Sequence, residues 1–191
     1  MIGGGIVGTS VAYHLTLNGE TDVVLLEQGE LSCGTTWHAA GLVGQLRATQ
    51  SGTTLVQYSA SLYEQLEAET GLSSGFKRCG GVTVARTEDR MEQLRRTAAT
   101  ATAYDLECEL LTPDQAGERW PLIAIDDLVG GLWLPGDGTA NPTDVTQALA
   151  RGARQRGGTV IEHVRVLEVL VADGAVTGVR TGQADIEAEI V

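Results

Sequence analysis

The chain begins Met1-Ile-Gly-Gly-Gly-Ile-Val-Gly8, and its glycines at positions 3, 5 and 8 have the spacing G-x-G-x-x-G. Apolar residues follow at helical spacing, and Asn18-Gly19 predicts where that helix stops. The run Asp22-Val-Val-Leu-Leu-Glu27 is typical of a strand buried in a parallel sheet, and it ends on an acid. Turn, helix, strand and carboxylate in this order predict an α/β fold with a Rossmann-like, dinucleotide-binding domain.

Each part of this unit has a physical role in binding a dinucleotide. Gly3 permits a tight turn, Gly5 lets a pyrophosphate approach the backbone, and Gly8 lets the helix pack closely on the sheet. The helix N-terminus offers free N–H groups and a positive dipole end to the phosphates. Glu27, nineteen residues beyond Gly8, is placed to accept hydrogen bonds from a ribose. The alternative is a glycine-rich loop ahead of an ordinary helix.

Composition argues against several classes of function. The formal net charge of −12 disfavours nucleic acid as a partner, because phosphate contacts need clustered Lys and Arg. No stretch approaches the ~20 apolar residues of a membrane helix and no leader is visible, so we expect a cytoplasmic protein, unless a targeting segment has been lost with the N-terminus. Cys33, Cys79 and Cys108 lie far apart, so neither a disulfide framework nor a metal site is predicted.

A second segment flanked by small residues, Gly34-Thr-Thr-Trp-His-Ala-Ala-Gly-Leu42, follows the acid. With Gly3–Gly8 and Leu25–Glu27, it resembles the dimethylglycine and sarcosine dehydrogenases, which belong to a wider family of FAD-dependent amine and amino-acid oxidoreductases that includes D-amino-acid oxidase. The resemblance implies that the segment wraps a flavin and that His38 is joined covalently to the flavin ring. A neutral imidazole is a suitable nucleophile for the 8α-carbon, which becomes electrophilic when it loses a proton.

The motif and the resemblance together imply a set of cofactor-binding residues around FAD. The set is Gly3, Gly5, Ile6, Val7, Gly8, Glu27, Gln28, Gly34, Thr35, Thr36, Trp37, His38, Ala39, Ala40, Gly41, Leu42 and Val166, the last through its backbone at the adenine. Thr35 and Trp37 are also candidates for gating residues near the ring. No catalytic base and no substrate clamp is assigned. His14 and His163 lack such a context and are interpreted as structural or exposed, and Cys33 is interpreted as a packing residue rather than a redox group.

The rest of the chain alternates between helical and strand patterns. Helices are expected over residues 51–70, after Thr87, at Thr112–Trp120, and from Asn141-Pro142, an N-cap with proline at the first helical position, to about Arg156. Strands are expected at Cys79–Ala85, Glu109–Leu111, Thr159–Glu162 (the third parallel strand), in a hairpin turning at Asp173-Gly174, and from Ala184 onward. We assign residues 1–74 to the first part of an FAD-binding domain, 75–139 to the start of an inserted α+β substrate domain, and 140–191 to the incomplete continuation of the FAD-binding domain.

The function implied by the resemblance is oxidation of the N-methyl C–H of dimethylglycine or sarcosine. Hydride removal gives an iminium that yields formaldehyde or passes to folate, with a small N-methylated amino acid as substrate and a separate electron acceptor. We expect the chain to be the N-terminal portion of such an enzyme and to turn nothing over alone.

Two alternatives remain at this stage. One is a related glycine or amino-acid oxidase with non-covalent FAD. The other is a non-catalytic nucleotide-binding fragment, favoured because only Met1 and Ile2 precede Gly3 where a first strand of about 5 to 6 residues is usual, and because the second half of the flavoprotein unit is missing.

Overall fold

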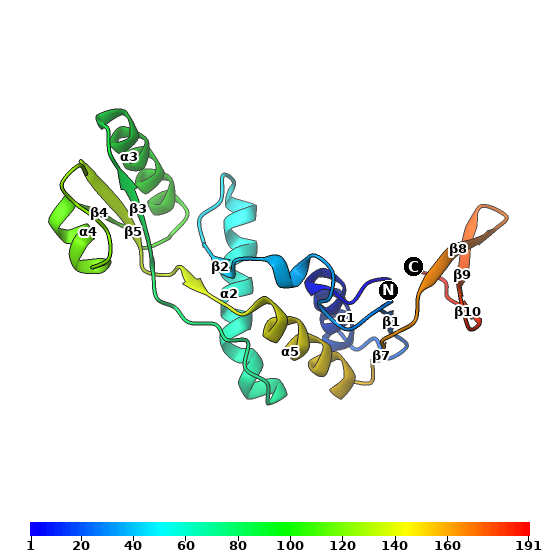
Figure 1. Ribbon diagram of the computed structural model, residues 1–191. Helices are drawn as coiled ribbons and strands as arrows, with labels where there is room; N and C mark the ends of the chain where they lie inside the picture. The colour runs from blue at the N-terminus through cyan, green and yellow to red at the C-terminus, as the bar shows by residue number, and fades with distance from the viewer. The chain divides into compact units, whose positions relative to one another are not determined.

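The computed structural model describes residues Met1–Val191, whose helices and strands are shown in Figure 1. The chain forms two compact units. Unit 1 contains Met1–Gly41, Tyr63–Gly75 and Ala140–Val191, and unit 2 contains Leu42–Leu62 and Phe76–Thr139. Each unit buries apolar side chains of its own. In unit 1 a core cluster consists of Ala12, Val23, Leu25, Leu31, Ala150 and Ala153. In unit 2 a core cluster consists of Ala85, Met91, Leu94, Ala98 and Leu132.

The parallel sheet of unit 1 is small. Strand β1 (Val24–Leu26) pairs in parallel with β7 (Thr159–Ile161), the predicted third parallel strand. On the other side of β1, Ile2 forms a parallel bridge with Leu26. The Gly3 N–H donates to the Leu26 carbonyl at 2.8 Å, and the Leu26 N–H donates to the Met1 carbonyl at 3.0 Å. Met1 and Ile2 are therefore paired with β1 immediately before the glycines.

Helices α1 (Ile6–Leu17) and α5 (Pro142–Gln155) pack together in unit 1. Helix α1 ends at Asn18, with Gly19 at φ +97°, as the sequence predicted. Helix α5 begins as predicted, because the Asn141 side chain accepts hydrogen bonds from the first-turn amides at positions 143 and 144. A β-carbon on Gly152 would lie 2.7 Å from the Tyr13 ring, so glycine at this position allows the close approach of the two helices.

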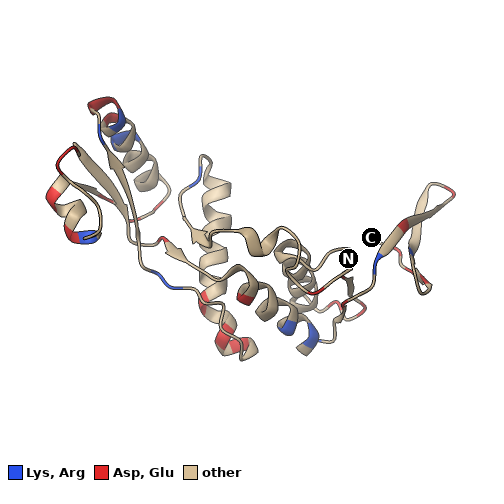
Figure 2. Cartoon of the chain, viewed as in Figure 1, with Lys and Arg blue, Asp and Glu red and all other residues tan.

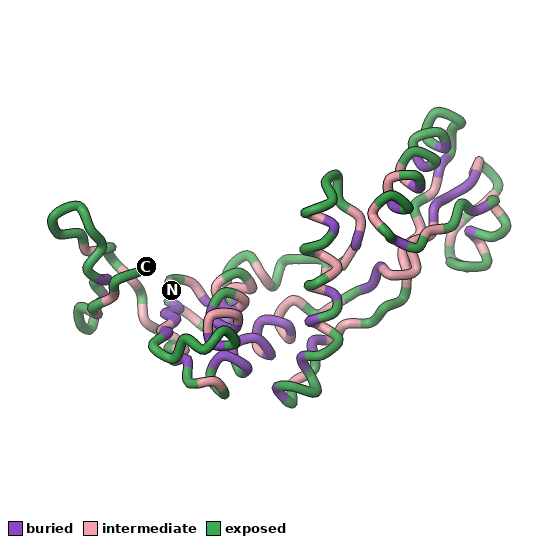
Figure 3. Tube along the Cα trace, turned by 180° about the vertical axis from the view of Figure 1, so that it is seen from behind, coloured by how far each residue is buried: buried purple, intermediate pink, exposed green.

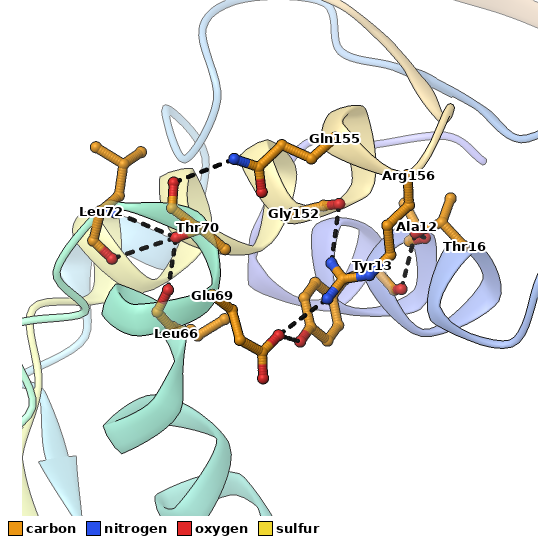
Figure 4. A network of polar contacts seen from close by, with 10 residues as sticks. All are labelled: Ala12, Tyr13, Thr16, Leu66, Glu69, Thr70, Leu72, Gly152, Gln155 and Arg156. Atoms are coloured by element: carbon orange, nitrogen blue, oxygen red, sulfur yellow. Dashed lines mark hydrogen bonds and ion pairs between the residues drawn. The ribbon is translucent and has the colours of Figure 1, made fainter.

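A polar network at the surface of this helix pair ties it to the C-terminal end of α2 (Gln50–Thr70), as Figure 4 shows. The Tyr13 hydroxyl donates to the Glu69 carboxylate at 2.5 Å, and Arg156 donates to the same oxygen at 2.9 Å. The Arg156 guanidinium also lies over the Tyr13 ring, 4.8 Å from its centroid. Burial and the Glu69 carboxylate raise the pKa of Tyr13 to about 12, so the phenol stays a donor throughout the physiological range.

Unit 1 ends in an antiparallel sheet formed by β8 (Val166–Ala172), β9 (Ala175–Thr181) and β10 (Asp185–Glu187). Its hairpin turns at Asp173 and Gly174, both at positive φ, as the Asp-Gly pair predicted. The final strand covers only three residues of the predicted stretch from Ala184 onward, and it pairs antiparallel with β9. Most of the β8–β9 hairpin is exposed (Figure 3).

Unit 2 contains an antiparallel sheet in the order β3-β5-β4, made of β3 (Gly81–Ala85), β5 (Gly130–Leu134) and β4 (Glu109–Leu111). Helix α3 (Glu88–Ala103) is capped by the predicted Thr87, whose hydroxyl accepts from the Arg90 N–H at 3.2 Å. Helix α4 (Pro113–Arg119) begins with a capping box of Thr112 and Gln115. These caps explain why the two helices start where polar residues interrupt the apolar pattern.

Two features of unit 2 differ from the expectations. Strand β5 was not predicted, and neither was the pairing of β2 (Leu42–Val43) with β6 (Gly138–Thr139). Through this pairing, and through the Gln45 N–H that donates to the Asp137 carboxylate at 2.8 Å, residues 42–62 belong to unit 2. The unit boundary therefore differs from the predicted segment 1–74, because long-range strand pairing decides it.

Candidate cofactor-binding site

The glycine turn, residues 3–8, has a backbone that excludes side chains at defined positions. Gly3 has φ +101°, a conformation that other residues rarely adopt. A β-carbon on Gly8 would lie 2.0 Å from the Gly3 carbonyl oxygen, and one on Gly5 would lie 2.9 Å from the Thr36 hydroxyl. Nothing lies within 4 Å of the corresponding position on Gly3. The turn thus presents bare backbone to its surroundings, as a pyrophosphate requires.

The first turn of α1 provides hydrogen-bond donors beside this backbone. Its N-cap, Gly5, has no side chain that could occupy them. The Ile6 N–H donates to the Thr36 hydroxyl oxygen at 3.0 Å, and the first helical bond runs from the Thr9 N–H to the Gly5 carbonyl. The N–H groups of Val7 and Gly8 precede that bond and have no partner within the helix. They are the donors that fit phosphate oxygens.

Glu27 closes β1 and is buried, with 8% of its surface exposed. Its carboxylate accepts from the Gly4 N–H at 2.6 Å and the Gly29 N–H at 2.9 Å. Burial pushes the pKa of Glu27 upward, but the hydrogen bonds from Gly29 and Gly4, with smaller contributions from Cys33 and Gln28, outweigh it and lower the pKa. Glu27 is therefore ionised at neutral pH, and its oxygens can each accept more than one hydrogen bond, including one from a ribose hydroxyl.

Residues 34–41, called here the histidine segment, contain a short 3-10 turn, η1 (Thr36–His38). The His38 Nδ1 lies 3.1 Å from the Gly34 carbonyl oxygen. A carbonyl oxygen only accepts, so Nδ1 carries the proton in the neutral ring and the lone pair is on Nε2. The His38 ring is exposed and lies against the Trp37 ring, with centroids 4.0 Å apart and planes inclined by 35°. In this tautomer the Nε2 lone pair belongs to an exposed side chain.

The structure brings some of the predicted site residues together and separates others. Hydrogen bonds join the glycine turn directly to Glu27 and to Thr36. Gly41, at φ +78°, packs its backbone on Ala140, and Gln28, Thr35, Ala39 and Ala40 are exposed. Val166 opens β8, two residues after Val164, whose N–H donates to the Glu27 carbonyl at 2.8 Å. Leu42, by contrast, is part of β2 in unit 2.

Cys33 corrects one interpretation made from the sequence. It is exposed rather than a packing residue, and its thiol lies 3.7 Å from a Glu27 carboxylate oxygen. Nearby, the Ser32 N–H donates to the Gly4 carbonyl at 3.0 Å, which links the loop after β1 back to the glycine turn. No periodic pattern in the sequence predicts either contact. The glycine at position 29 is consistent with the Cys33 position, because a β-carbon there would lie 2.9 Å from the Cys33 sulfur.

The other two histidines fit the structural or exposed roles expected of them. The His14 Nδ1 lies 2.6 Å from the Ser10 carbonyl within α1, and His163 is exposed in the loop after β7. Lys and Arg residues occur in several separate elements of the chain (Figure 2). No group of three or more His, Cys, Asp or Glu residues is arranged to hold a metal ion. No helix is both long enough and apolar enough to cross a membrane.

The glycine turn, the start of α1 and Glu27 form a dinucleotide-binding arrangement, and comparison with known proteins specifies which one. Residues 1–191 match the family DAO, FAD dependent oxidoreductase. The chain belongs to this family. The family expected from the sequence motifs is thereby confirmed, and with it the assignment to FAD-dependent oxidoreductases.

Curated relatives of this family member include both enzymes and a regulatory protein. The chain is 42% identical over 191 residues to 4-methylaminobutanoate oxidase (formaldehyde-forming) of Paenarthrobacter nicotinovorans, covering 100% of the chain and 23% of the relative. It is 41% identical to the mitochondrial pyruvate dehydrogenase phosphatase regulatory subunit of Mus musculus, and this match covers 98% of the chain and 21% of the relative. It is 38% identical to human mitochondrial sarcosine dehydrogenase, and this match covers 90% of the chain and 19% of the relative. The chain spans about a fifth of the length of these relatives.

Solved structures support the same fold class. L-proline dehydrogenase from P. horikoshii superposes with a TM-score of 0.92 at 28% identity, covering 99% of this chain and 50% of that one. Glycine oxidase from Bacillus cereus superposes with a TM-score of 0.85 at 27% identity, covering 98% and 52%. The predicted α/β fold of an FAD-dependent oxidoreductase is confirmed by these likenesses.

Proposed function

We propose that the chain holds FAD for an amine oxidoreductase that oxidises the N-methyl C–H bond of a small N-methylated amino acid. The single observation that carries this proposal is the joined arrangement of the glycine turn, the first turn of α1 and Glu27 in a member of an FAD-dependent family. Relatives named as sarcosine dehydrogenase and 4-methylaminobutanoate oxidase support the N-methylated substrate class. When bound, FAD supplies the acceptor for the hydride that leaves the substrate.

The residues of this chain have separate tasks in holding the cofactor. The N–H groups of Val7 and Gly8 bind the pyrophosphate oxygens, because they point out of the helix N-terminus and lack helical partners. Glu27 accepts from the ribose hydroxyls, and its negative charge disfavours a ribose that carries a phosphate. The glycine turn keeps side chains away from the phosphates.

His38 bonds covalently to the flavin in this proposal, and the structure favours Nε2 as the bonding atom. The Nδ1 proton is held by the Gly34 carbonyl, so the Nε2 lone pair is directed outward. His38 would hold the flavin through Nε2 and would give up its Nδ1 proton on forming the bond. The oxidised flavin would supply the electrophilic 8α-carbon and take up the two electrons, which the separate electron acceptor would then remove. The small residues Ala39 and Ala40 leave the approach to the ring unobstructed, since both are exposed.

Mass spectrometry of the purified, acid-denatured protein tests the cofactor and its linkage together. Acid releases flavin that is not covalently bound, so we expect an added mass of one FAD on the peptide that contains His38. His38→Ala should lose the added mass, and His163→Ala, which changes an exposed histidine elsewhere, should keep it. Flavin found only in the supernatant would contradict the covalent linkage, and a protein that binds no FAD at all would contradict the proposed function.

Two other functions have specific support. The likeness to glycine oxidase favours an amino-acid oxidase with non-covalent FAD, which would release all its flavin in acid and oxidise a primary amine faster than an N-methylated one. The relative named as a regulatory subunit favours a protein that binds FAD without turnover. Flavin reduction by sarcosine, dimethylglycine and glycine, measured without oxygen on the full-length protein, separates the three functions, since the regulatory alternative predicts no reduction by any of them.

A further inference from the structure

Trp37 is a large side chain that is not used in either hydrophobic core. It is 57% exposed, yet it is held at two points. Its indole N–H donates to the Cys33 carbonyl at 3.2 Å, and its ring lies against His38 with 4.0 Å between centroids. An exposed indole that is fixed by a hydrogen bond on one edge and a ring contact on its face is suited to orienting its neighbour.

His38 would be poorly oriented without that contact. The hydrogen bond from Nδ1 to Gly34 fixes one edge of the imidazole, but the plane of the ring can still tilt about this bond. The Trp37 ring, inclined by 35° to the imidazole, restricts that tilt. The backbone adds a third constraint, because the His38 N–H donates to the Thr35 carbonyl at 3.1 Å. Together the three contacts fix the direction of the Nε2 lone pair.

We propose that Trp37 is a positioning residue for His38, which holds the imidazole so that Nε2 meets the flavin. This inference rests on the proposed function, in which His38 is the attachment residue. Trp37 acts through His38 rather than on the reacting carbon itself. Its removal should therefore slow covalent attachment while leaving the reversible binding of FAD nearly unchanged, because that binding depends on the glycine turn and Glu27.

The test separates the rate of attachment from the affinity for FAD. Apoprotein is mixed with FAD, and covalent incorporation is followed over time for wild type, Trp37→Phe and Trp37→Ala. Trp37→Phe keeps a stacking ring but loses the bond to Cys33, and Trp120→Ala, an equally exposed tryptophan in unit 2, is the matched control. Affinity is measured in the His38→Ala background with and without Trp37→Ala. We expect Trp37→Ala to attach on the order of tenfold more slowly, Trp37→Phe to be intermediate, and the dissociation constant to stay within about twofold.

The outcomes distinguish this inference from the function on which it rests. Attachment in Trp37→Ala at the wild-type rate overturns the inference and leaves the proposed function intact. Parallel losses of affinity and thermal stability also overturn it, because they indicate a structural role. A wild type that binds FAD without attaching it contradicts the covalent linkage and overturns this inference with it, while FAD binding by the chain stands.

Discussion

In the glycine turn, residues 3–8, the backbone forms the site, whereas in the histidine segment, residues 34–41, exposed side chains form it. The turn is constrained by the clash that a side chain would cause at Gly8 and by the hydrogen bond from Gly4 to Glu27. In the histidine segment, Thr36 accepts from the Ile6 N–H and the Trp37 indole donates to the Cys33 carbonyl, while the side chains of Trp37 and His38 remain exposed. Under the proposed function, affinity for the nucleotide would depend on the glycine turn and reactivity toward the flavin on the histidine segment, so substitutions in the two parts of unit 1 should have different effects.

The largest effect should come from adding one carbon to the glycine turn. In Gly8→Ala the new carbon would lie 2.0 Å from the Gly3 carbonyl oxygen, and overpacking of this kind costs roughly 1–3 kcal/mol or more. If this cost falls on the conformation that binds FAD, affinity should decrease by about 5- to 150-fold. Gly34→Ala makes the same change in the histidine segment, where nothing lies within 4 Å, and stability should change by less than about 1 kcal/mol. Calorimetry measures the stability of these variants and FAD titration measures their affinity, with Gly182→Ala as control. Equal losses in Gly8→Ala and Gly34→Ala would contradict the difference between the turn and the histidine segment.

The next largest effect is a pH dependence of stability, caused by the Glu27 carboxylate that is bonded to the glycine turn. The folded-state pKa of Glu27 is lowered, so its carboxylate stabilises the fold above the unfolded value, near 4.5, and this contribution is lost as pH falls through the folded value. Glu27→Gln should unfold about 1–3 kcal/mol more easily at pH 7, and the difference from wild type should shrink below pH 4.5. Urea unfolding at several pH values measures it. Glu30→Gln, exposed on the same loop, is the control, and a difference that stays constant with pH would contradict the assignment.

A smaller effect should appear where the turn and the histidine segment meet. Thr36→Val keeps the shape of the side chain but removes the oxygen that accepts from the Ile6 N–H. We expect a loss of about 1 kcal/mol, as for other caps of a helix N-terminus. Thr35→Val changes the neighbouring exposed threonine and should cost less. Denaturant midpoints of the two variants measure the difference. Equal shifts in both would show that the hydrogen bond from Ile6 to Thr36 does not stabilise the fold.

The smallest effect is expected at Cys33. Its thiol lies 3.7 Å from a Glu27 oxygen, at the weak end of hydrogen bonds to sulfur. Cys33→Ser keeps a donor at this position, so unfolding free energy should change by no more than about 0.5 kcal/mol. FAD affinity should remain within about twofold. A larger loss of affinity would place the sulfur in direct contact with the cofactor.

Much of the fold could be predicted from local signals in the sequence. The glycine spacing with Glu27, the stop at Asn18-Gly19 and the turn at Asp173-Gly174 each have a backbone conformation that only certain residues favour. Thr87 and Asn141 likewise mark helix starts, because their side chains accept from amides two or three residues ahead. Such signals lie within a few residues of the structure that they specify.

The features that were missed depend on partners distant in the sequence. Strand β5 begins Gly130-Gly131, and glycine is disfavoured in strands. Here it is required, since a β-carbon would lie 2.7 Å from the Leu111 carbonyl at position 130 and 3.0 Å from the Thr83 carbonyl at position 131. The two-residue strands β2 and β6 are too short to show a period of two. The hydrogen bond between Thr36 and Ile6 joins residues thirty positions apart, and no local pattern in the sequence predicts it.

The hydrogen bond from Ile6 to Thr36 makes the Ile6 amide a probe of whether the histidine segment is docked on α1. The amide of Ile6 is the first of α1 and has no partner within the helix, so the Thr36 oxygen is what shields it from solvent. Its deuterium uptake should therefore be slow while the histidine segment is docked and fast when the segment detaches. The exchange of a single backbone amide would thus measure how often the histidine segment detaches from α1, without a bound flavin.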